Sequence, residues 1–293
     1  MKVGYFAVGI GPLTEPAMIK AVALATERLG FSTLWAPEHV VLLSEYASRY
    51  PYSEGEFPMP VDTPFGDPFT TLTYAAALTS KIRLATGICL VPEHNPLVLA
   101  KTVATADRLS SGRFILGTGI GWLEEEFEAI GVIWERRAHR TREYIEAMRL
   151  LWSGEQASYS GEFVNFRGAL SYPKPAGNRR VPVWFGGESG PALRRVAEYG
   201  DGWVGFNLTS DEAAPKIRRI GELLEACGRK RSDIEIAVSP YGKPITKDDL
   251  KRYRDLGVDE VPLVNFDIPP TEREVVARIE QLARDFVEPA AKL

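Results

Sequence analysis

Apolar residues along the chain alternate between short continuous runs and helical spacing. Residues 82–90 form a mostly apolar run of strand length, and residues 114–116 begin another. Between them, Asn95 and Pro96 are typical of a helix start, and Gly112 is typical of a helix end. This stretch therefore predicts a strand, a helix and a second strand in succession.

The same alternation continues along all 293 residues without a linker. We expect further strands at 2–8, 31–36, 181–185, 203–206, 234–239 and 260–265, and further helices at 15–29, 67–80, 123–153, 191–199, 211–227, 246–256 and 271–286. About eight such units predict an α/β protein in which residues 1–293 form a single (β/α)8 barrel domain.

A doubly wound sheet with a second domain is the alternative architecture. Such folds carry a glycine fingerprint after the first strand, and the sequence from Gly9 to Pro12 lacks the third glycine. The GTGIG sequence that begins at Gly117 has Trp122 where the third glycine would stand. The barrel is therefore the favoured prediction.

Two segments depart from the alternation. The segment from Pro37 to Gly66, after the second strand, is rich in proline, tyrosine and charge and predicts a long loop. Its aromatic residues favour an ordered lid over a disordered segment. A second excursion, with aromatics and glycines from Tyr159 to Tyr172, predicts a hairpin before the fifth strand.

Composition and charge narrow the possible functions. The net charge is -4 and no basic cluster is present, so the chain lacks the electrostatic signature of a nucleic-acid or membrane-surface partner. The N-terminus is too quickly polar for a signal peptide, and no apolar run could span a bilayer. We expect a cytoplasmic protein that acts on a small molecule. Cys89 and Cys227 are far apart and suggest neither a zinc module nor a disulfide framework.

Barrel enzymes place their chemistry where strands end, so the residues at these positions are the candidate site. Only three histidines occur in the chain, which argues against a metal site and leaves the metal prediction as none. Glycines and aromatic residues instead suggest a flat, bulky cofactor. The strand-end candidates are Glu38, His39, Gly87, Ile88, Cys89, Gly119, Trp122, Gly186, Gly187 and Ser189.

Residues 186–190 could hold the phosphate of such a cofactor. Small residues leave backbone N–H groups accessible, Ser189 offers a hydroxyl, and a helix is expected to start at Pro191. Glu188 should point away, because a carboxylate repels a phosphate. A plain tight turn is the alternative for the glycine pair.

Several segments together resemble the luciferase-like monooxygenase superfamily, and specifically its coenzyme F420-dependent oxidoreductase branch. They are LWAPEHVV from Leu34, RYPYSEGEFP from Arg49, the stretch from Ile82 to Trp122, the helix region ending at Trp152, and VPVWFGGESGPALRRVAEYGDGW from Val181. The resemblance implies a (β/α)8 barrel, a homodimer, and an isoalloxazine-like ring lying over the strand ends.

Residue by residue, the resemblance places His39 beside the ring as the catalytic residue, next to Glu38. It implies a non-proline cis peptide near Ile88 and Cys89 that supports the ring, and a phosphate held by Gly186, Gly187 and Ser189. Related sugar-phosphate dehydrogenases have a glutamate proton donor where this chain has Trp122. A larger apolar substrate is therefore more plausible than a sugar phosphate.

Three functions remain open from the sequence. The favoured one is F420-dependent hydride transfer to or from a carbonyl or unsaturated compound. FMN-dependent monooxygenation is the alternative, and a flavin-binding protein without turnover is the second alternative. An accessible ring face with His39 directed at it would separate the enzyme from the binding protein.

Overall fold

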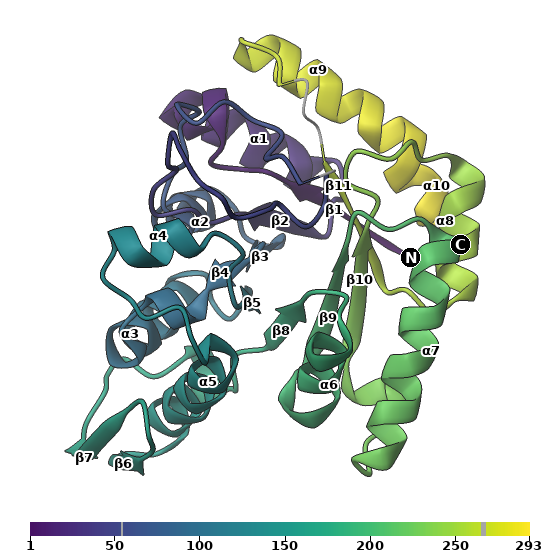
Figure 1. The fold of residues 1–293 in the computed structure, drawn as a ribbon. Helices are drawn as coiled ribbons and strands as arrows, with labels where there is room; N and C mark the ends of the chain where they lie inside the picture. The colour runs from purple at the N-terminus through teal and green to yellow at the C-terminus, as the bar shows by residue number, and fades with distance from the viewer. Residues whose placement is uncertain (54, 265–267) are drawn as a thin grey trace.

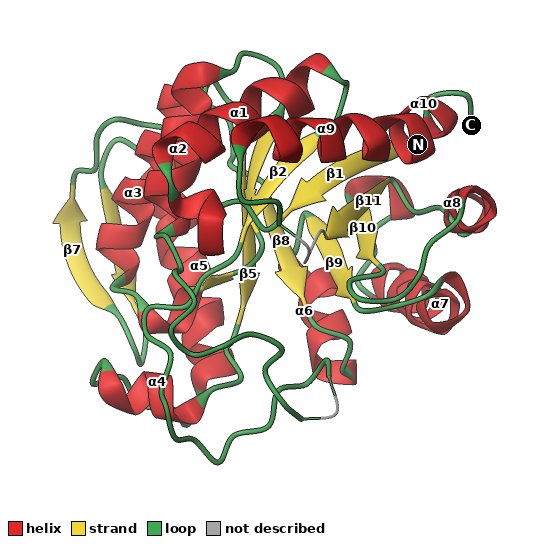
Figure 2. Cartoon of the chain, turned by 90° about the horizontal axis from the view of Figure 1, so that it is seen from above, coloured by secondary structure: helices red, strands yellow, loops and turns green. Residues whose placement is uncertain are grey.

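Eight parallel strands close into a barrel in the computed structural model, which describes residues 1–53, 55–264 and 268–293. Neighbouring strands pair in parallel around the ring, and the last strand pairs with the first, Lys2 opposite Glu260. Helices surround the strands on all sides (Figures 1 and 2). The predicted (β/α)8 fold is confirmed. The barrel strands are β1 (Lys2–Phe6), β2 (Thr33–Ala36), β3 (Arg83–Thr86), β5 (Phe114–Gly119), β8 (Val183–Gly186), β9 (Gly202–Phe206), β10 (Glu235–Ser239) and β11 (Glu260–Val264).

The outer layer consists of helices, and the longer ones bury apolar side chains in the core around the sheet. Within the described residues, no helix is both long and apolar enough to cross a membrane. The helices are α1 (Pro16–Arg28), α2 (Pro68–Leu78), α3 (Pro96–Leu109), α4 (Glu124–Ala129), α5 (Arg137–Ser153), α6 (Gly190–Tyr199), α7 (Ser210–Ala226), α8 (Lys247–Asp255), α9 (Glu272–Leu282) and α10 (Glu288–Ala290).

Two predicted elements are divided in the structure. The run 82–90 forms β3 and the short β4 (Cys89–Leu90), and the cis peptide between them joins Gly87 to Ile88, one residue before the expected position. The region 123–153 forms α4 and α5, because Gly131 adopts a φ of 72° after α4 and ends that helix.

The two departures from the barrel pattern follow the sequence prediction. The hairpin before β8 pairs β6 (Ala157–Ser160) with β7 (Asn165–Ala169) in antiparallel fashion. The long loop follows β2, and its residue Glu54 lies outside the described residues. The predicted last strand was to end at Asn265, which also lies outside them, and the structure describes it to Val264.

The first residues of five strands form a polar network at the N-terminal end of the barrel. Glu260 is fully buried and accepts hydrogen bonds from Thr33 Oγ1 at 2.8 Å and from Arg83 Nη2 at 2.5 Å. Arg83 also contacts Glu235 at 3.0 Å, and Glu235 accepts from Lys2 at 2.8 Å. Paired charges therefore fill the centre of this end of the barrel, and the large cavity of the described residues lies at the other end.

Candidate functional site at the C-terminal ends of the strands

A cavity of about 810 Å³ opens at the C-terminal ends of the strands. Its wall is mostly apolar and comes from the strand ends, from the long loop after β2 and from the first turns of α5 and α6. Nine of the ten predicted site residues line it: Glu38, His39, Gly87, Ile88, Gly119, Trp122, Gly186, Gly187 and Ser189. The structure therefore brings together residues that are up to 151 positions apart, from Glu38 to Ser189.

His39 is held by a carboxylate that the sequence did not indicate. Its Nδ1 lies 2.8 Å from Oε2 of Glu126 on α4, and Glu126 is only 1% exposed. The other oxygen of Glu126 accepts from the backbone N–H groups of Val40 at 2.6 Å and Val41 at 3.1 Å. If Nδ1 carries the hydrogen toward Glu126, Nε2 of the neutral ring is the free acceptor. The pair therefore fixes the imidazole while leaving one nitrogen for proton chemistry.

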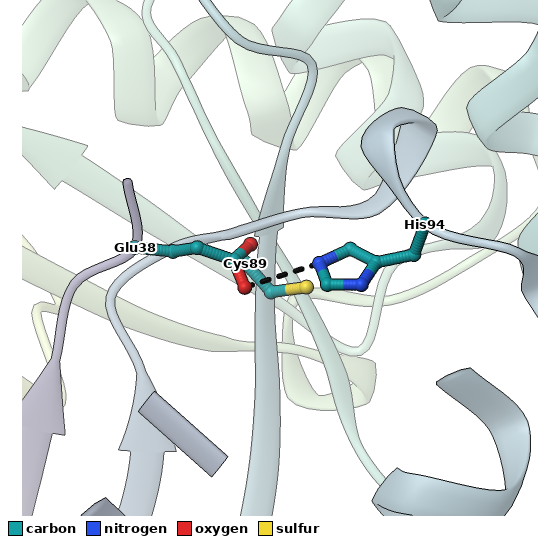
Figure 3. Close-up of side chains that lie close together, drawn as sticks. All are labelled: Glu38, Cys89 and His94. Carbon is teal, nitrogen blue, oxygen red and sulfur yellow. Dashed lines mark hydrogen bonds and ion pairs between the residues drawn. The ribbon is translucent and has the colours of Figure 1, made fainter. Parts of the chain in front are cut away.

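Glu38 points away from His39 and supports β4. Its carboxylate accepts from the backbone N–H of Leu90 at 2.5 Å and lies 3.0 Å from Nε2 of His94. Figure 3 shows Glu38, His94 and the thiol of Cys89 gathered at one point. Burial, followed by the charge of Glu38, raises the pKa of the Cys89 thiol well above its usual value, so it stays protonated.

Cys89 is the one predicted site residue that does not line the cavity. The Cys89 side chain is fully buried in the main core, beside Glu38 and His94 and behind the cavity wall. His94 has the structural role that was expected, because its Nε2 is bound to Glu38. Burial lowers the pKa of His94, but the hydrogen bond and the charge of Glu38, with the charge of Asp67, together raise it. The three side chains are the one group among the described residues whose metal-binding atoms come within 4.8 Å of one another. Since Glu38 already serves Leu90 and His94, we interpret the group as a hydrogen-bonded support for the cavity wall.

Aromatic side chains of the long loop cover the cavity beside His39. Trp122 stacks on Phe57 with ring centroids 5.9 Å apart, and the edge of Tyr50 meets it at 5.2 Å. Phe57 also contacts the His39 ring at 5.3 Å. The loop is tied down by Glu125 of α4, which accepts from the backbone N–H groups at 47 and 48 at 2.6 and 3.1 Å. The loop thus forms a packed aromatic lid whose position depends on α4.

The predicted phosphate cradle lies at the N-terminus of α6. Gly187 has a φ of 102°, and a side-chain carbon there would come within 3.1 Å of Cβ of Ala192. Ser189 is the helix N-cap and accepts from the N–H of Ala192 at 3.3 Å, so its hydroxyl hydrogen is left to donate. Glu188 uses its carboxylate to accept from the N–H of Phe206 at 2.8 Å. The cradle therefore presents backbone and hydroxyl donors to the cavity.

Two arginines beside the cradle were not predicted from the sequence. Arg137 and Arg195 both line the cavity, and the Nε atom of each is buried without a hydrogen-bond partner. Burial lowers the pKa of both guanidinium groups, and the charge of Arg195 lowers that of Arg137 further. Neither forms an ion pair with a carboxylate in the described part of the chain. Arg195 lies in the second turn of the helix predicted at 191–199, after a glycine-rich strand end, and this is the signal that could have identified it. Arg137 lies in the middle of the helix predicted at 123–153 and carried no such signal.

These features fit a cofactor with a flat ring and an anionic group. The cradle at 186–190 and the unpaired Nε atoms of Arg137 and Arg195 would hold the phosphate. At Gly119 a side-chain carbon would collide with Cδ1 of Ile88, so the wall is smooth where β4 and β5 end. The ring would lie against this wall and within reach of His39.

Comparison with known proteins identifies a matching family. Residues 1–261 match the family model of luciferase-like monooxygenases. An uncharacterised protein of Mycobacterium tuberculosis is 36% identical over 267 residues, covering 90% of this chain and 92% of that protein. An F420-dependent glucose-6-phosphate dehydrogenase of Kineococcus radiotolerans is 30% identical over 231 residues, covering 75% of this chain and 62% of that enzyme.

A solved structure shares the fold at lower identity. The crystal structure of monooxygenase RslO1 from Streptomyces bottropensis superimposes with a TM-score of 0.75 at 20% identity, covering 98% of this chain and 99% of that one. The matched fold thus accompanies both an F420-dependent dehydrogenase and a monooxygenase in these comparisons. The barrel, the strand-end cavity and the family match over residues 1–261 lead to one conclusion: this chain belongs to the luciferase-like monooxygenase family.

Proposed function

We propose that this protein is a coenzyme F420-dependent oxidoreductase that transfers hydride to or from a small carbonyl or unsaturated compound. One observation carries the proposal: a single cavity joins the carboxylate-held His39 to an anion cradle flanked by two arginines whose Nε atoms have no hydrogen-bond partner among the described residues. A proton-transfer group and an anchor for a phosphate-bearing cofactor are the two parts that such a reaction requires. We further propose that the enzyme acts as a cytoplasmic homodimer.

The choice of F420 over FMN rests on sequence likeness. The APEH segment before the long loop, the YPYSEGEFP lid and the GWLEEEF segment resemble the F420 branch. A relative at 30% identity is named an F420-dependent dehydrogenase. Bound F420 would supply a hydride carrier that reacts poorly with oxygen, which favours dehydrogenation or reduction over monooxygenation.

Different residues of the cavity would have different roles in the proposed reaction. Arg137, Arg195 and the cradle bind the anionic group and fix the depth of the cofactor. Gly119 and Ile88 shape the wall behind the ring. His39, oriented by Glu126, accepts or donates the substrate proton at Nε2. The aromatic lid excludes water from the reacting atoms.

The lid also affects which class of substrate the cavity can bind. Trp122 stands where related sugar-phosphate dehydrogenases have a glutamate, and it packs among Phe57, Tyr50 and Tyr46. This part of the cavity is an apolar surface that would bind an apolar compound better than a sugar. We therefore propose an apolar carbonyl or α,β-unsaturated substrate.

An anaerobic turnover experiment tests the proposed activity. Reduced F420 is mixed with the protein and with a panel of apolar aldehydes, ketones and α,β-unsaturated compounds, and the return of the oxidised cofactor's absorbance is followed. The reverse reaction is tested with oxidised F420 and the corresponding alcohols. Turnover that requires the protein and falls in the His39→Ala variant supports the proposal. Oxygen-dependent turnover with reduced FMN alone would support monooxygenation instead, and tight cofactor binding without turnover would indicate a binding protein.

A further inference from the structure

Three carboxyl groups gather behind the cavity wall next to His39. Glu38 follows β2, Glu126 lies on α4, and Glu93 ends the helical turn Val91–Glu93 after β4. Glu126 is paired with His39 and Glu38 with His94. Among the described residues, Glu93 has no such partner: both of its carboxyl oxygens are buried without a hydrogen bond. An ionised carboxylate in that position would be costly.

Glu93 lies directly behind a residue that lines the cavity. A side-chain carbon at Gly121 would come within 3.5 Å of Oε1 of Glu93, and Gly121 is part of the cavity wall. The ring of Phe127, which follows Glu126 on α4, packs against the same glycine. Glu93 is therefore placed between the wall of the site and the helix that carries the partner of His39.

The groups that face Glu93 are predominantly acidic. Glu126 faces it from α4 and Glu38 from the segment after β2, while Cys89 and His94 are the titratable neighbours from its own segment. Burial, followed by the charges of Glu126 and Glu38, raises the pKa of Glu93 to about 9. At neutral pH it is a carboxylic acid, and the three carboxyls carry two negative charges.

We propose that Glu93 is a positioning residue that holds the proton of this three-carboxyl group and acts on the site through Glu126 and His39. While Glu93 is uncharged, Glu126 stays undisturbed in its bonds to His39, Val40 and Val41. When Glu93 ionises, its negative charge repels the carboxylate of Glu126 and weakens the support that Glu126 gives to His39. The importance of this for catalysis rests on the proposed function, whereas the proton on Glu93 does not.

Histidine NMR of the cofactor-free protein tests the proposal. The chain has only three histidines, so the imidazole signals can be assigned by substitution. We expect the His39 signals of the wild type to shift near pH 9, where Glu93 ionises, and this step to be absent in Glu93→Gln, because Gln mimics the uncharged acid. The control Glu128→Gln, which removes an exposed carboxylate from α4, should retain the step. Identical His39 curves in wild type and Glu93→Gln would overturn the proposal.

Thermal unfolding across pH gives a second readout that is independent of activity. A carboxyl whose pKa is raised by folding contributes fully to stability only below its unfolded value, and that contribution is lost as pH rises through the folded value. Glu93→Gln should therefore unfold at a higher temperature than the wild type at pH 7, with the gap widening up to about pH 9 and closing near pH 4. An equal or lower unfolding temperature at pH 7 would contradict the proton on Glu93. Absence of F420 turnover would overturn only the proposed function, since neither measurement uses a cofactor.

Discussion

A buried carboxylate makes His39 a better candidate for proton transfer than an isolated histidine would be. Glu126 fixes the ring through Nδ1, and the lid rings of Phe57 and Phe65 contact its edge at 5.3 and 5.5 Å. The imidazole is therefore held in one orientation, and Nε2 is the nitrogen that the bond to Glu126 does not use. Proton transfer from a group held in this way is more effective because no reorientation is needed in the transition state.

The first prediction concerns His39 itself. His39→Ala should lower turnover by about 10²- to 10⁴-fold, the usual effect of losing an acid-base group, while the Kd of the cofactor changes little. Steady-state kinetics and a binding titration on the same preparation separate the two effects. His139→Ala, at an exposed position on α5, is the control and should retain full turnover. Unchanged turnover in His39→Ala would leave His39 as part of the cavity wall.

The second prediction concerns the anion site. Arg195→Gln removes a half-buried guanidinium that has no carboxylate partner in the described part of the chain, so the phosphate of the cofactor loses a charged hydrogen bond worth about 1.5–3 kcal/mol. The Kd should rise by roughly 10- to 100-fold. Arg194→Gln changes the exposed neighbour on α6 and should leave the Kd unaltered, as measured by isothermal titration calorimetry. Equal affinity in both variants would place the phosphate elsewhere.

At the level of single residues, the sequence predicted the site residues at strand ends but not the side chains that bind or flank them. His39, Gly119 and Gly187 could be identified because the carboxyl ends of parallel strands share one rim. Glu126 could not, since its contact with Val40 joins residues 86 positions apart and helical spacing does not reveal which acidic residue turns inward. Arg195 was missed for the same reason.

Among the elements, α4 has an importance beyond its six residues. It supplies Glu126 to His39 and Glu125 to the backbone of the lid. The helix therefore couples the position of the lid to the orientation of the imidazole. A substitution in α4 should therefore alter the position of the lid more than it alters the barrel.

The third prediction follows from this coupling. Glu125→Gln should speed hydrogen exchange at Ala47 and Ser48, because an amide oxygen accepts more weakly than a carboxylate. Backbone and side-chain hydrogen bonds outweigh burial and lower the pKa of Glu125 to about 2. The clamp is therefore fully present above the ordinary glutamate range and is lost only as pH falls toward 2.

Exchange measured by mass spectrometry checks the lid prediction. Glu45→Gln, an exposed lid residue, serves as the control and should exchange like the wild type. If Glu125→Gln also exchanged like the wild type, the clamp would not hold the lid.

Element boundaries were predictable where apolar periodicity and caps agree. Helix α3 starts at Pro96 after the Asn95 cap, as expected, because Asn95 accepts from the N–H groups of Leu97 and Val98. The break between β3 and β4 was not predictable from apolar periodicity, because the apolar run continues through Ile88 while the strand is interrupted; only the family resemblance indicated a cis peptide nearby. Hydropathy reports burial and is insensitive to such a change of backbone direction.

In the molecule as a whole, the two ends of the barrel have different roles: one contributes to stability and the other contains the candidate site. The N-terminal end holds the network around Glu260, and the C-terminal end holds the cavity. Glu260 accepts from Trp35 Nε1 at 2.8 Å as well as from Thr33 and Arg83, and it is fully buried. A residue that joins β11 to β2 and β3 across the barrel axis should be important for closure.

The fourth prediction tests this role. Glu260→Ala leaves the buried donors of Thr33, Trp35 and Arg83 without their acceptor and should destabilise the protein by about 3–5 kcal/mol. Glu280→Ala breaks an exposed ion pair with Arg28 and should cost at most about 1 kcal/mol. Urea unfolding of the two variants measures both values. A similar small loss in each would show that the network is not needed for closure.

Cofactor binding to the purified apoprotein is the most direct test of the proposed F420 dependence. The protein is titrated separately with F420 and with FMN under the same conditions, and fluorescence reports binding. We expect saturable, tighter binding of F420, reduced in Arg195→Gln and retained in His39→Ala. Tight binding of FMN with none for F420 would contradict the proposed F420 dependence.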